Sequence, residues 1–147
     1  MRSIALLMLL LLSAAAYGQI LHESSRQLGH GFREVTRSVK NPPGHWEGIG
    51  HFGYVYYKDT LLDQCSGSDF FISPQGHYAI YNNSSTGVLI LFETRTRASR
   101  AITKVFTGLI NKIEWHESDK SATVYFEPSE PGKPQAKPLT ITLTVGA

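Results

Sequence analysis

The chain contains almost no cysteine. One residue of the 147 is a cysteine, Cys65, so no intrachain disulfide can form. Small exported domains that lack a sufficient core are usually cross-linked by disulfides. A fold of this chain must therefore rest on its own hydrophobic core. Three alternatives stay open for Cys65: a small buried residue, a free thiol or an intermolecular link.

Long hydrophobic runs are also lacking. The longest, Ile4–Leu12, falls short of the roughly 20 residues that span a bilayer. It follows a positive end that contains Arg2 and precedes 13–18, which are small residues apart from Tyr17, and this is the layout of a secretory signal peptide. We predict cleavage near Gly18–Gln19 and export to the periplasm or the extracellular space. No cysteine comes directly after the run, since the only one is Cys65, so we expect no lipid or membrane anchor after the signal is removed.

An excess of charge of one sign is lacking as well. The chain has 14 basic and 12 acidic residues, and loss of Arg2 with the signal leaves 13 against 12. A protein that binds nucleic acid or an anionic membrane through its overall charge carries a clear basic excess. The composition therefore predicts no nucleic-acid partner, and a protein is the partner class that we expect.

The motifs of common catalytic centres are missing: no Gly-x-Ser-x-Gly, His-Glu-x-x-His or phosphate-binding glycine loop occurs. His45, Glu47 and His51 offer two imidazoles and a carboxylate. A zinc site needs three or four ligands in fixed geometry, and His51 would need a bend in its strand to join the other two. Cys65 and His77 likewise have no spacing that orients a nucleophile toward a base. We predict no enzyme, with no catalytic, metal-binding or cofactor-binding residues and no cofactor.

The chain that remains after the signal is long enough for one domain. Removing residues 1–18 from 147 leaves 129, which is enough to bury roughly two thirds of the unfolded surface. Residues 19–44 are polar and weakly patterned, and we expect an N-terminal arm there. Residues 45–147 are expected to form a single β-rich domain.

Strand-like patterns occupy most of that domain. Aromatic and β-branched residues dominate Phe52–Tyr57, as in a half-buried strand. Apolar residues alternate with threonines in Leu139–Val145. Val88–Phe92 is apolar at every position, which is typical of a central strand buried on both faces. The sequence predicts a mainly β fold, an antiparallel sheet or sandwich of about seven strands.

One segment changes period. Its apolar residues fall on a single stripe of a helix with 3.6 residues per turn: Ala98, Ala101, Ile102, Val105, Phe106 and Leu109. Arg97, Arg100 and Lys104 lie off the stripe, as on a solvated face. The pattern predicts one amphipathic helix at about 97–110, packed against the sheet.

Ser73-Pro74-Gln75-Gly76 predicts a β-turn, because proline fixes φ at its first central position and glycine follows. Short apolar runs flank this turn, and a third run follows a polar loop, within 70–93. This segment resembles one repeat of the WD40-like (PD40) β-propeller family, in which the turn is Ser-Pro-Asp-Gly, so Gln75 departs from that pattern. A fainter copy covers 113–126, at a blade-like spacing. A closed propeller needs at least four blades, for which the chain is too short. The resemblance implies a binding scaffold rather than a catalyst.

Tyrosine is the other abundant feature, with seven in the chain. Its large area and low entropy cost favour it at interfaces. We expect a contact surface that includes Tyr54, Tyr56, Tyr57, Tyr81 and Trp46. The predicted function is exported, non-catalytic binding of a protein or other macromolecule, for example as an inhibitor-type module. Two alternatives stay open: a small exported hydrolase or metal-dependent enzyme, and a structural subunit that completes its sheet with another chain, most simply through the strand at 139–145.

Overall fold

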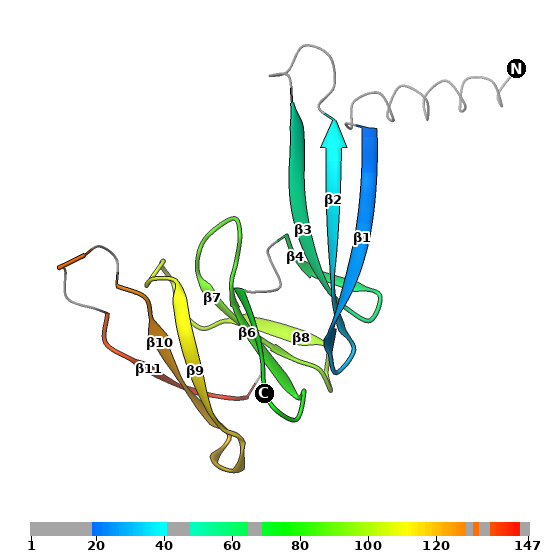
Figure 1. Ribbon diagram of the computed structural model, residues 1–147. Helices are drawn as coiled ribbons and strands as arrows, with labels where there is room; N and C mark the ends of the chain where they lie inside the picture. Colours follow the sequence, from blue (N-terminus) through cyan, green and yellow to red (C-terminus); the bar gives the residue numbers. More distant parts are fainter. Residues whose placement is uncertain (1–18, 41–47, 65–68, 129–130, 133–135, 145–147) are drawn as a thin grey trace, which may run out of the picture.

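The computed structural model describes residues 19–40, 48–64, 69–128, 131–132 and 136–144 of the chain. Within these ranges the chain forms eleven strands and one turn of 3-10 helix, arranged in three antiparallel sheets (Figure 1). The mainly β, antiparallel fold class is confirmed, with more strands than the seven expected. The predicted signal peptide, His45, Trp46, Glu47 and Cys65 lie outside the described residues.

The first sheet has the strand order β1-β2-β3-β4, with the bounds β1 (Gln19–Gly29), β2 (Phe32–Lys40), β3 (Ile49–Tyr57) and β4 (Thr60–Asp63). The expectation of an arm at 19–44 is corrected here. Strands β1 and β2 form a hairpin, and β2 pairs with β3 along its whole length, from Phe32 opposite Tyr57 to Lys40 opposite Ile49.

The turn of the first hairpin explains how a polar segment reverses direction. Gly29, His30 and Gly31 have φ of 96°, 52° and 87°. Glycine adopts positive φ at little steric cost, whereas other residues rarely do. The Gly-His-Gly sequence therefore suits this tight turn, and the amide of Lys58 in the next hairpin donates to the carbonyl of Gly31 at 2.8 Å.

The second sheet is a meander in the order β5-β6-β7-β8, with the bounds β5 (Phe70–Ile72), β6 (Tyr78–Asn82), β7 (Leu89–Glu93) and β8 (Ala98–Ala101). The predicted turn between the first two strands is confirmed, because the amide of Gly76 donates to the carbonyl of Ser73 at 2.8 Å. Gly76 has φ of 74°, and a Cβ there would meet the ring of His30 at 2.4 Å. The turn of the first hairpin thus lies directly on this turn.

The helix predicted at 97–110 is wrong. Residues 98–101 form β8, which pairs with β7 from Glu93 opposite Ala98 to Ile90 opposite Ala101. Arg97 has φ of 54° and reverses the chain before β8. The rest of the apolar stripe is not buried, since Val105 is 70% exposed and Phe106 57%. Several β-branched residues lower the helix propensity of this segment, and an edge position beside β7 satisfies the backbone instead.

The third sheet has the order β11-β10-β9, with the bounds β9 (Ile110–His116), β10 (Ser121–Phe126) and β11 (Leu139–Thr142). The 3-10 turn η2 (Glu117–Asp119) joins β9 to β10, and Lys120 with φ of 50° completes it. Alternate residues of β10 are buried, as expected for a strand with one face on the core.

The second sheet lies between the other two. On one face Ala79 and Phe92 pack with residues of the first sheet, in a cluster that contains Phe32, Val55 and Tyr57. On the other face Ile80 and Leu91 pack with the third sheet, in a cluster that contains Val124, Phe126, Ile141 and Leu143. Strand β7 contributes to both clusters, so the prediction of a central strand buried on both faces is confirmed.

The first sheet extends beyond this packed region. Figure 1 shows the start of β1, the end of β2 and the start of β3 standing clear of the other two sheets. The residues of β1 are exposed apart from Leu28, which is half-buried. A sheet that projects in this way presents a broad surface on its outward face.

Candidate functional site

Alternation along β3 sorts its tyrosines between the two faces of the first sheet. Val55 and Tyr57 point inward and belong to the core cluster with Phe92. Successive side chains of a strand point to opposite faces, so Tyr54 and Tyr56 point outward, and both are half-buried. The outward face of this sheet therefore presents two half-buried tyrosines of β3.

Two arginines of β2 stack on these tyrosines. The guanidinium carbon of Arg33 lies 4.5 Å from the ring centroid of Tyr56, and that of Arg37 lies 5.0 Å from the centroid of Tyr54. Pairing explains the first stack, because Arg33 is directly opposite Tyr56 in the ladder. Opposite residues of an antiparallel pair share a face. We call these four residues, Arg33, Arg37, Tyr54 and Tyr56, the Arg–Tyr face.

The two arginines differ in their charge environment. Arg37 donates from Nε to Oε2 of Glu23 at 2.6 Å, and this hydrogen bond raises the pKa of Arg37 above its usual value. Arg33 has no carboxylate partner among the described residues, and its side chain stacks on Tyr56. The face therefore carries one positive charge that the described part of the chain does not neutralise.

Apolar side chains border the Arg–Tyr face. Val35 lies between the two arginines and is 2% exposed, although it belongs to neither core cluster. Ile20 is opposite Val39, and Leu61 is opposite Tyr56, and both are about half exposed. The face thus combines flat aromatic rings, oriented cations and an apolar margin.

The five residues expected to form a contact surface do not all lie together in the structure. Tyr54 and Tyr56 lie side by side on the outward face. Tyr57 and Tyr81 lie in the core, 8% and 3% exposed, so they are not available to a partner. Trp46 is outside the described residues.

Arg33 and Arg37 were missed by the sequence reasoning, because their segment was expected to be an arm. A signal for them did exist. Residues spaced two positions apart share one face of a strand, and this spacing relates Arg33, Val35, Arg37 and Val39. Nothing in the sequence, however, places this face beside the tyrosines of β3.

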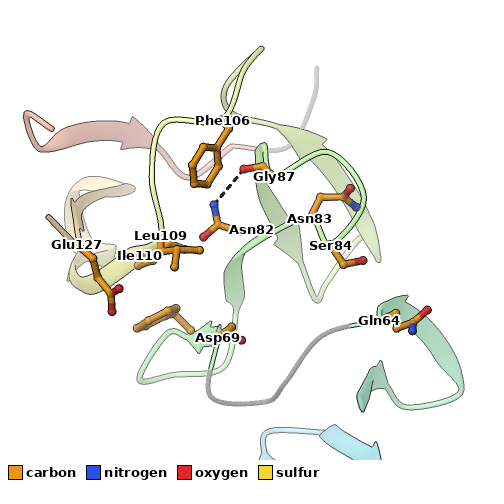
Figure 2. A pocket seen from close by; sticks show the side chains of 11 residues that line it. Gln64, Asp69, Asn82, Asn83, Ser84, Gly87, Phe106, Leu109, Ile110 and Glu127 are labelled. Atoms are coloured by element: carbon orange, nitrogen blue, oxygen red, sulfur yellow. Dashed lines mark hydrogen bonds between the residues drawn. The ribbon is translucent and has the colours of Figure 1, made fainter. Parts of the chain in front are cut away.

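A cavity lies elsewhere, between the second and third sheets. It has a volume of about 360 Å³ and is lined by eleven residues of β5, β6, β9 and the adjoining loops. Figure 2 shows Asn82 at its centre, below the ring of Phe106, with its amide nitrogen turned toward Gly87. This cavity was not anticipated from the sequence.

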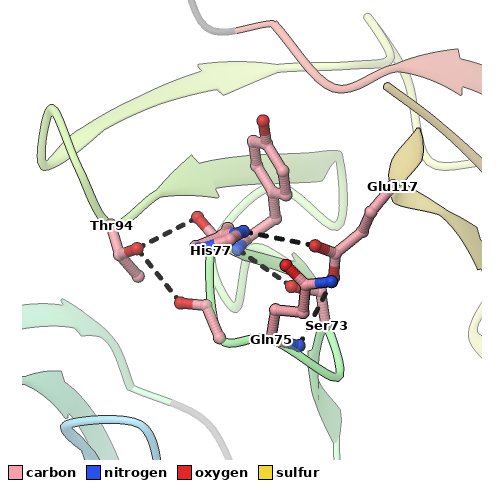
Figure 3. Close-up of polar contacts among 7 residues, drawn as sticks. Ser73, Gln75, His77, Thr94 and Glu117 are labelled. Atoms are coloured by element: carbon pink, nitrogen blue, oxygen red, sulfur yellow. Dashed lines mark hydrogen bonds and ion pairs between the residues drawn. The ribbon is translucent and has the colours of Figure 1, made fainter. Parts of the chain in front are cut away.

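The polar contacts at the junction of the sheets are structural. Nδ1 of His77 lies 3.2 Å from Oε2 of Glu117, and the amide of Gln75 donates to Oε1 of the same carboxylate at 3.5 Å (Figure 3). The hydroxyl of Thr94 donates to the carbonyl of Gly76 at 3.0 Å. These bonds attach the turn after β5 to η2 and to the end of β7. They hold two sheets in place.

The structure describes one residue of each set considered for a metal or a reaction centre, His51 and His77. His51 contacts the hydroxyl of Ser38 through Nδ1 at 2.9 Å, while His45 and Glu47 lie outside the described residues. Among the residues that the structure describes, no three His, Cys, Asp or Glu side chains form a group that could hold a metal ion. Cys65, the other half of the considered pair with His77, is also outside the described ranges.

Comparisons with known proteins find no relative. No family model, no curated protein and no solved structure matches the chain. The resemblance of 70–93 to a PD40 repeat therefore stays a prediction. In the ranges that the structure describes, no helix has the length and apolar character needed to cross a membrane.

Proposed function

We propose that this protein is an exported, non-catalytic binding protein that recognises a protein partner through its Arg–Tyr face. The observation that carries the proposal is the pair of Arg–Tyr stacks on the outward face of the first sheet, with Arg33 lacking a carboxylate partner among the described residues. The layout of residues 1–18 supports export. The partner would meet this face in the periplasm or outside the cell.

Physical chemistry favours such a surface for protein recognition. Tyrosine and arginine dominate the residues that carry most of the binding energy at interfaces. The stacking on Tyr56 holds the guanidinium of Arg33 in place before a partner arrives, so less side-chain entropy is lost on binding. A guanidinium can donate two parallel hydrogen bonds to one carboxylate. The expected partner therefore presents an acidic side chain to Arg33, beside apolar groups that cover Leu61.

A photo-crosslinking experiment tests this proposal. A benzoylphenylalanine replaces Tyr56 in one variant and Lys40 in another. Lys40 is exposed at the end of β2, where its partner in the ladder is Ile49. Ile49 is an odd number of residues from Tyr56, so the two positions are on opposite faces of the sheet. We expect one protein of the extracytoplasmic fraction to be linked through position 56 and not through position 40.

Binding measurements with the captured protein complete the test. Arg33→Ala should weaken its affinity by about 10-fold or more, as for a central interface residue. Lys40→Ala removes the same charge from the other face and should leave the affinity unchanged. Equal crosslinking at both positions, or equal affinities of the two variants, would contradict the proposal.

A structural subunit remains a second candidate, supported by the edge strand β1. It is the terminal strand of the first sheet and runs for 11 residues. An open edge of this length can pair with another strand. A crosslinked species with twice the mass of the chain, in place of a different protein, would favour this candidate.

A further inference from the structure

The cavity between the second and third sheets has a lining of uneven character. The apolar part of the lining consists of Phe71, Phe106, Leu109 and Ile110. The polar part consists of Gln64, Asp69, Asn82, Asn83, Ser84 and Glu127. The two parts are interleaved, since the amide of Glu127 donates to the carbonyl of Leu109 at 2.8 Å. None of the eleven lining residues is basic. At about 360 Å³ the cavity is at the small end of the range for ligand sites, suited to a small molecule or a single side chain.

The orientation of Asn82 is fixed by the protein. Its Nδ2 donates to the carbonyl of Gly87 and to the carbonyl of Gly108, both at 3.1 Å. Both amide hydrogens are therefore used, which leaves Oδ1 as an acceptor. Among the described residues Oδ1 has no donor. The cavity thus holds an acceptor that is aligned in advance.

The aromatic wall is fixed in a similar way. A Cβ on Gly87 would meet Cδ2 of Phe106 at 2.8 Å, so the ring of Phe106 packs directly on this glycine. Gly87 has φ of 71°, a conformation that glycine adopts at little cost. Phe106 is nevertheless 57% exposed, so the face of its ring that does not pack on Gly87 is available to a ligand.

The charge of the region is negative. Asp69 and Glu127 line the cavity and are exposed. Asp63, next to the lining residue Gln64, is 8% exposed and accepts from the amide of Ser84 at 2.8 Å and from its hydroxyl at 2.6 Å. These donors are neutral, so the charge of Asp63 is solvated but not cancelled by them. An anionic ligand would be repelled and a cation attracted.

We propose that this cavity binds an alkylammonium group, that is, a primary amine cation at the end of an apolar chain. The ammonium has three donors, one of which the Oδ1 of Asn82 accepts, while the carboxylates of Asp69 and Glu127 on the cavity lining supply the negative charge that attracts it. The methylene chain packs against Leu109 and Phe106, and an ammonium near the face of a phenyl ring gains further attraction. The group could belong to a free diamine or to a lysine of a peptide. The proposal does not depend on the Arg–Tyr face.

Titrations of the full chain with small probes test the proposal. The probes are n-butylammonium, n-butanol and butyrate, which share a carbon chain and differ in charge. We expect saturable shifts of the amide resonances of Asn82, Gly87 and Gly108 with n-butylammonium, and none with the other two. Saturation by butyrate, or an absence of saturable binding by the amine, would overturn the proposal.

Two matched variants locate the binding. Glu127→Gln should weaken binding of n-butylammonium by about 10-fold, the scale of a lost hydrogen bond to a charged group. Glu114→Gln removes the same charge from the exposed face of β9, outside the cavity lining, and should leave the affinity unchanged. Equal effects of the two changes would overturn the site, because they would indicate attraction by overall charge.

A second comparison identifies the source of the cation. The probes are n-butylammonium and Nα-acetyl-lysine amide, in which the ε-ammonium of the lysine is free. At least about 10-fold tighter binding of the lysine compound would support a peptide as the ligand, because backbone contacts add to those of the amine. Equal affinities would support a free amine.

Discussion

On the exposed surface of the third sheet, three neighbouring side chains set one another's protonation. Nζ of Lys112 lies 2.8 Å from Oε1 of Glu114, and the hydroxyl of Tyr125 donates to Oε2 of the same carboxylate at 2.9 Å. Both hydrogen bonds, first that from Lys112, lower the pKa of Glu114 below its usual value. The carboxylate in turn raises the pKa of Lys112 and of Tyr125.

The first prediction concerns this carboxylate. Lys112→Met removes the stronger of its two hydrogen bonds, so the pKa of Glu114 should rise toward the ordinary value. The side-chain carboxyl ¹³C shift of Glu114, followed as a function of pH, measures it. Lys104→Met removes the same charge from an exposed loop and should leave that pKa where it is. A pKa that is the same in the wild type and in both variants would show that Lys112 does not act on Glu114.

The sign of the pH dependence follows from the direction of the shift. A carboxylate whose pKa is lowered by folding stabilises the folded state above its unfolded pKa. That contribution is lost as the pH falls through the lower, folded pKa of Glu114. It should therefore be absent in acid, and smaller at neutral pH in Lys112→Met than in the wild type.

At the scale of the element, β8 has a second role beside its pairing with β7. The guanidinium of Arg100 donates from Nε to the carbonyl of Thr144 at 2.7 Å and from Nη2 to the carbonyl of Thr142 at 2.6 Å. These carbonyls belong to the segment whose edge the sequence reasoning expected to be open. Arg100, expected on a solvated helix face, instead connects the second and third sheets.

The second prediction tests this connection. Arg100→Ala removes both hydrogen bonds, so β11 should open more often and the amides of Ile141 and Leu143 should exchange faster, by about 5-fold or more. Amide hydrogen exchange followed by NMR measures the effect. Lys104→Ala, in the loop after β8, is the control and should leave β11 as it is. Unchanged exchange in Arg100→Ala would mean that pairing with β10 alone holds the strand.

The elements also show which local patterns were sufficient. The turn at 73–76 was predictable because proline and glycine restrict the backbone locally. The central position of β7 followed from an apolar run that requires cover on both faces. The prediction of a helix at 97–110 was wrong because the apolar residues of this segment have a helical period. Its pairing with β7 depends on a partner strand, which no pattern within the segment encodes.

At the scale of the whole molecule, the second sheet is shared by two core clusters. Phe92 packs its ring against Tyr57 and Phe32 of the first sheet, at centroid distances of 5.4 Å and 6.1 Å. Its neighbour Leu91 packs in the other cluster, beside the third sheet. A substitution on one face of β7 is therefore expected to destabilise both core clusters, because the same strand contributes to each.

The third prediction follows from this sharing. Phe92→Ala should lower the free energy of unfolding by about 3–5 kcal/mol, as for loss of a buried phenyl ring. Urea unfolding is followed through Trp115, which packs against the other cluster, in a Trp46→Phe background that leaves it as the one tryptophan. The transition seen at Trp115 should shift to a lower urea concentration, by the amount that corresponds to this whole loss of unfolding free energy.

The control for this experiment is Val105→Ala, since Val105 is 70% exposed. A surface change of this kind usually alters stability by about 0.5 kcal/mol or less. If the transition at Trp115 is the same in Phe92→Ala and in the wild type, the two clusters unfold independently and the sharing of β7 does not couple them.

The sequence by itself determined the features that depend on neighbours along the chain. These are the mainly β class, the turn at 73–76, the doubly buried strand around Leu91, and the layout that predicts export. Each follows from local composition or period, because backbone preference and alternation act over a few residues.

The tertiary structure alone decided which faces meet. Tyr54 and Tyr56 became a surface because β3 turned Val55 and Tyr57 toward Phe92, and β2 brought Arg33 and Arg37 alongside. The cavity likewise forms where loops distant in sequence meet at Asn82. Strand pairing and sheet packing are contacts between distant residues, so their outcome depends on the whole core and cannot be obtained from any one segment.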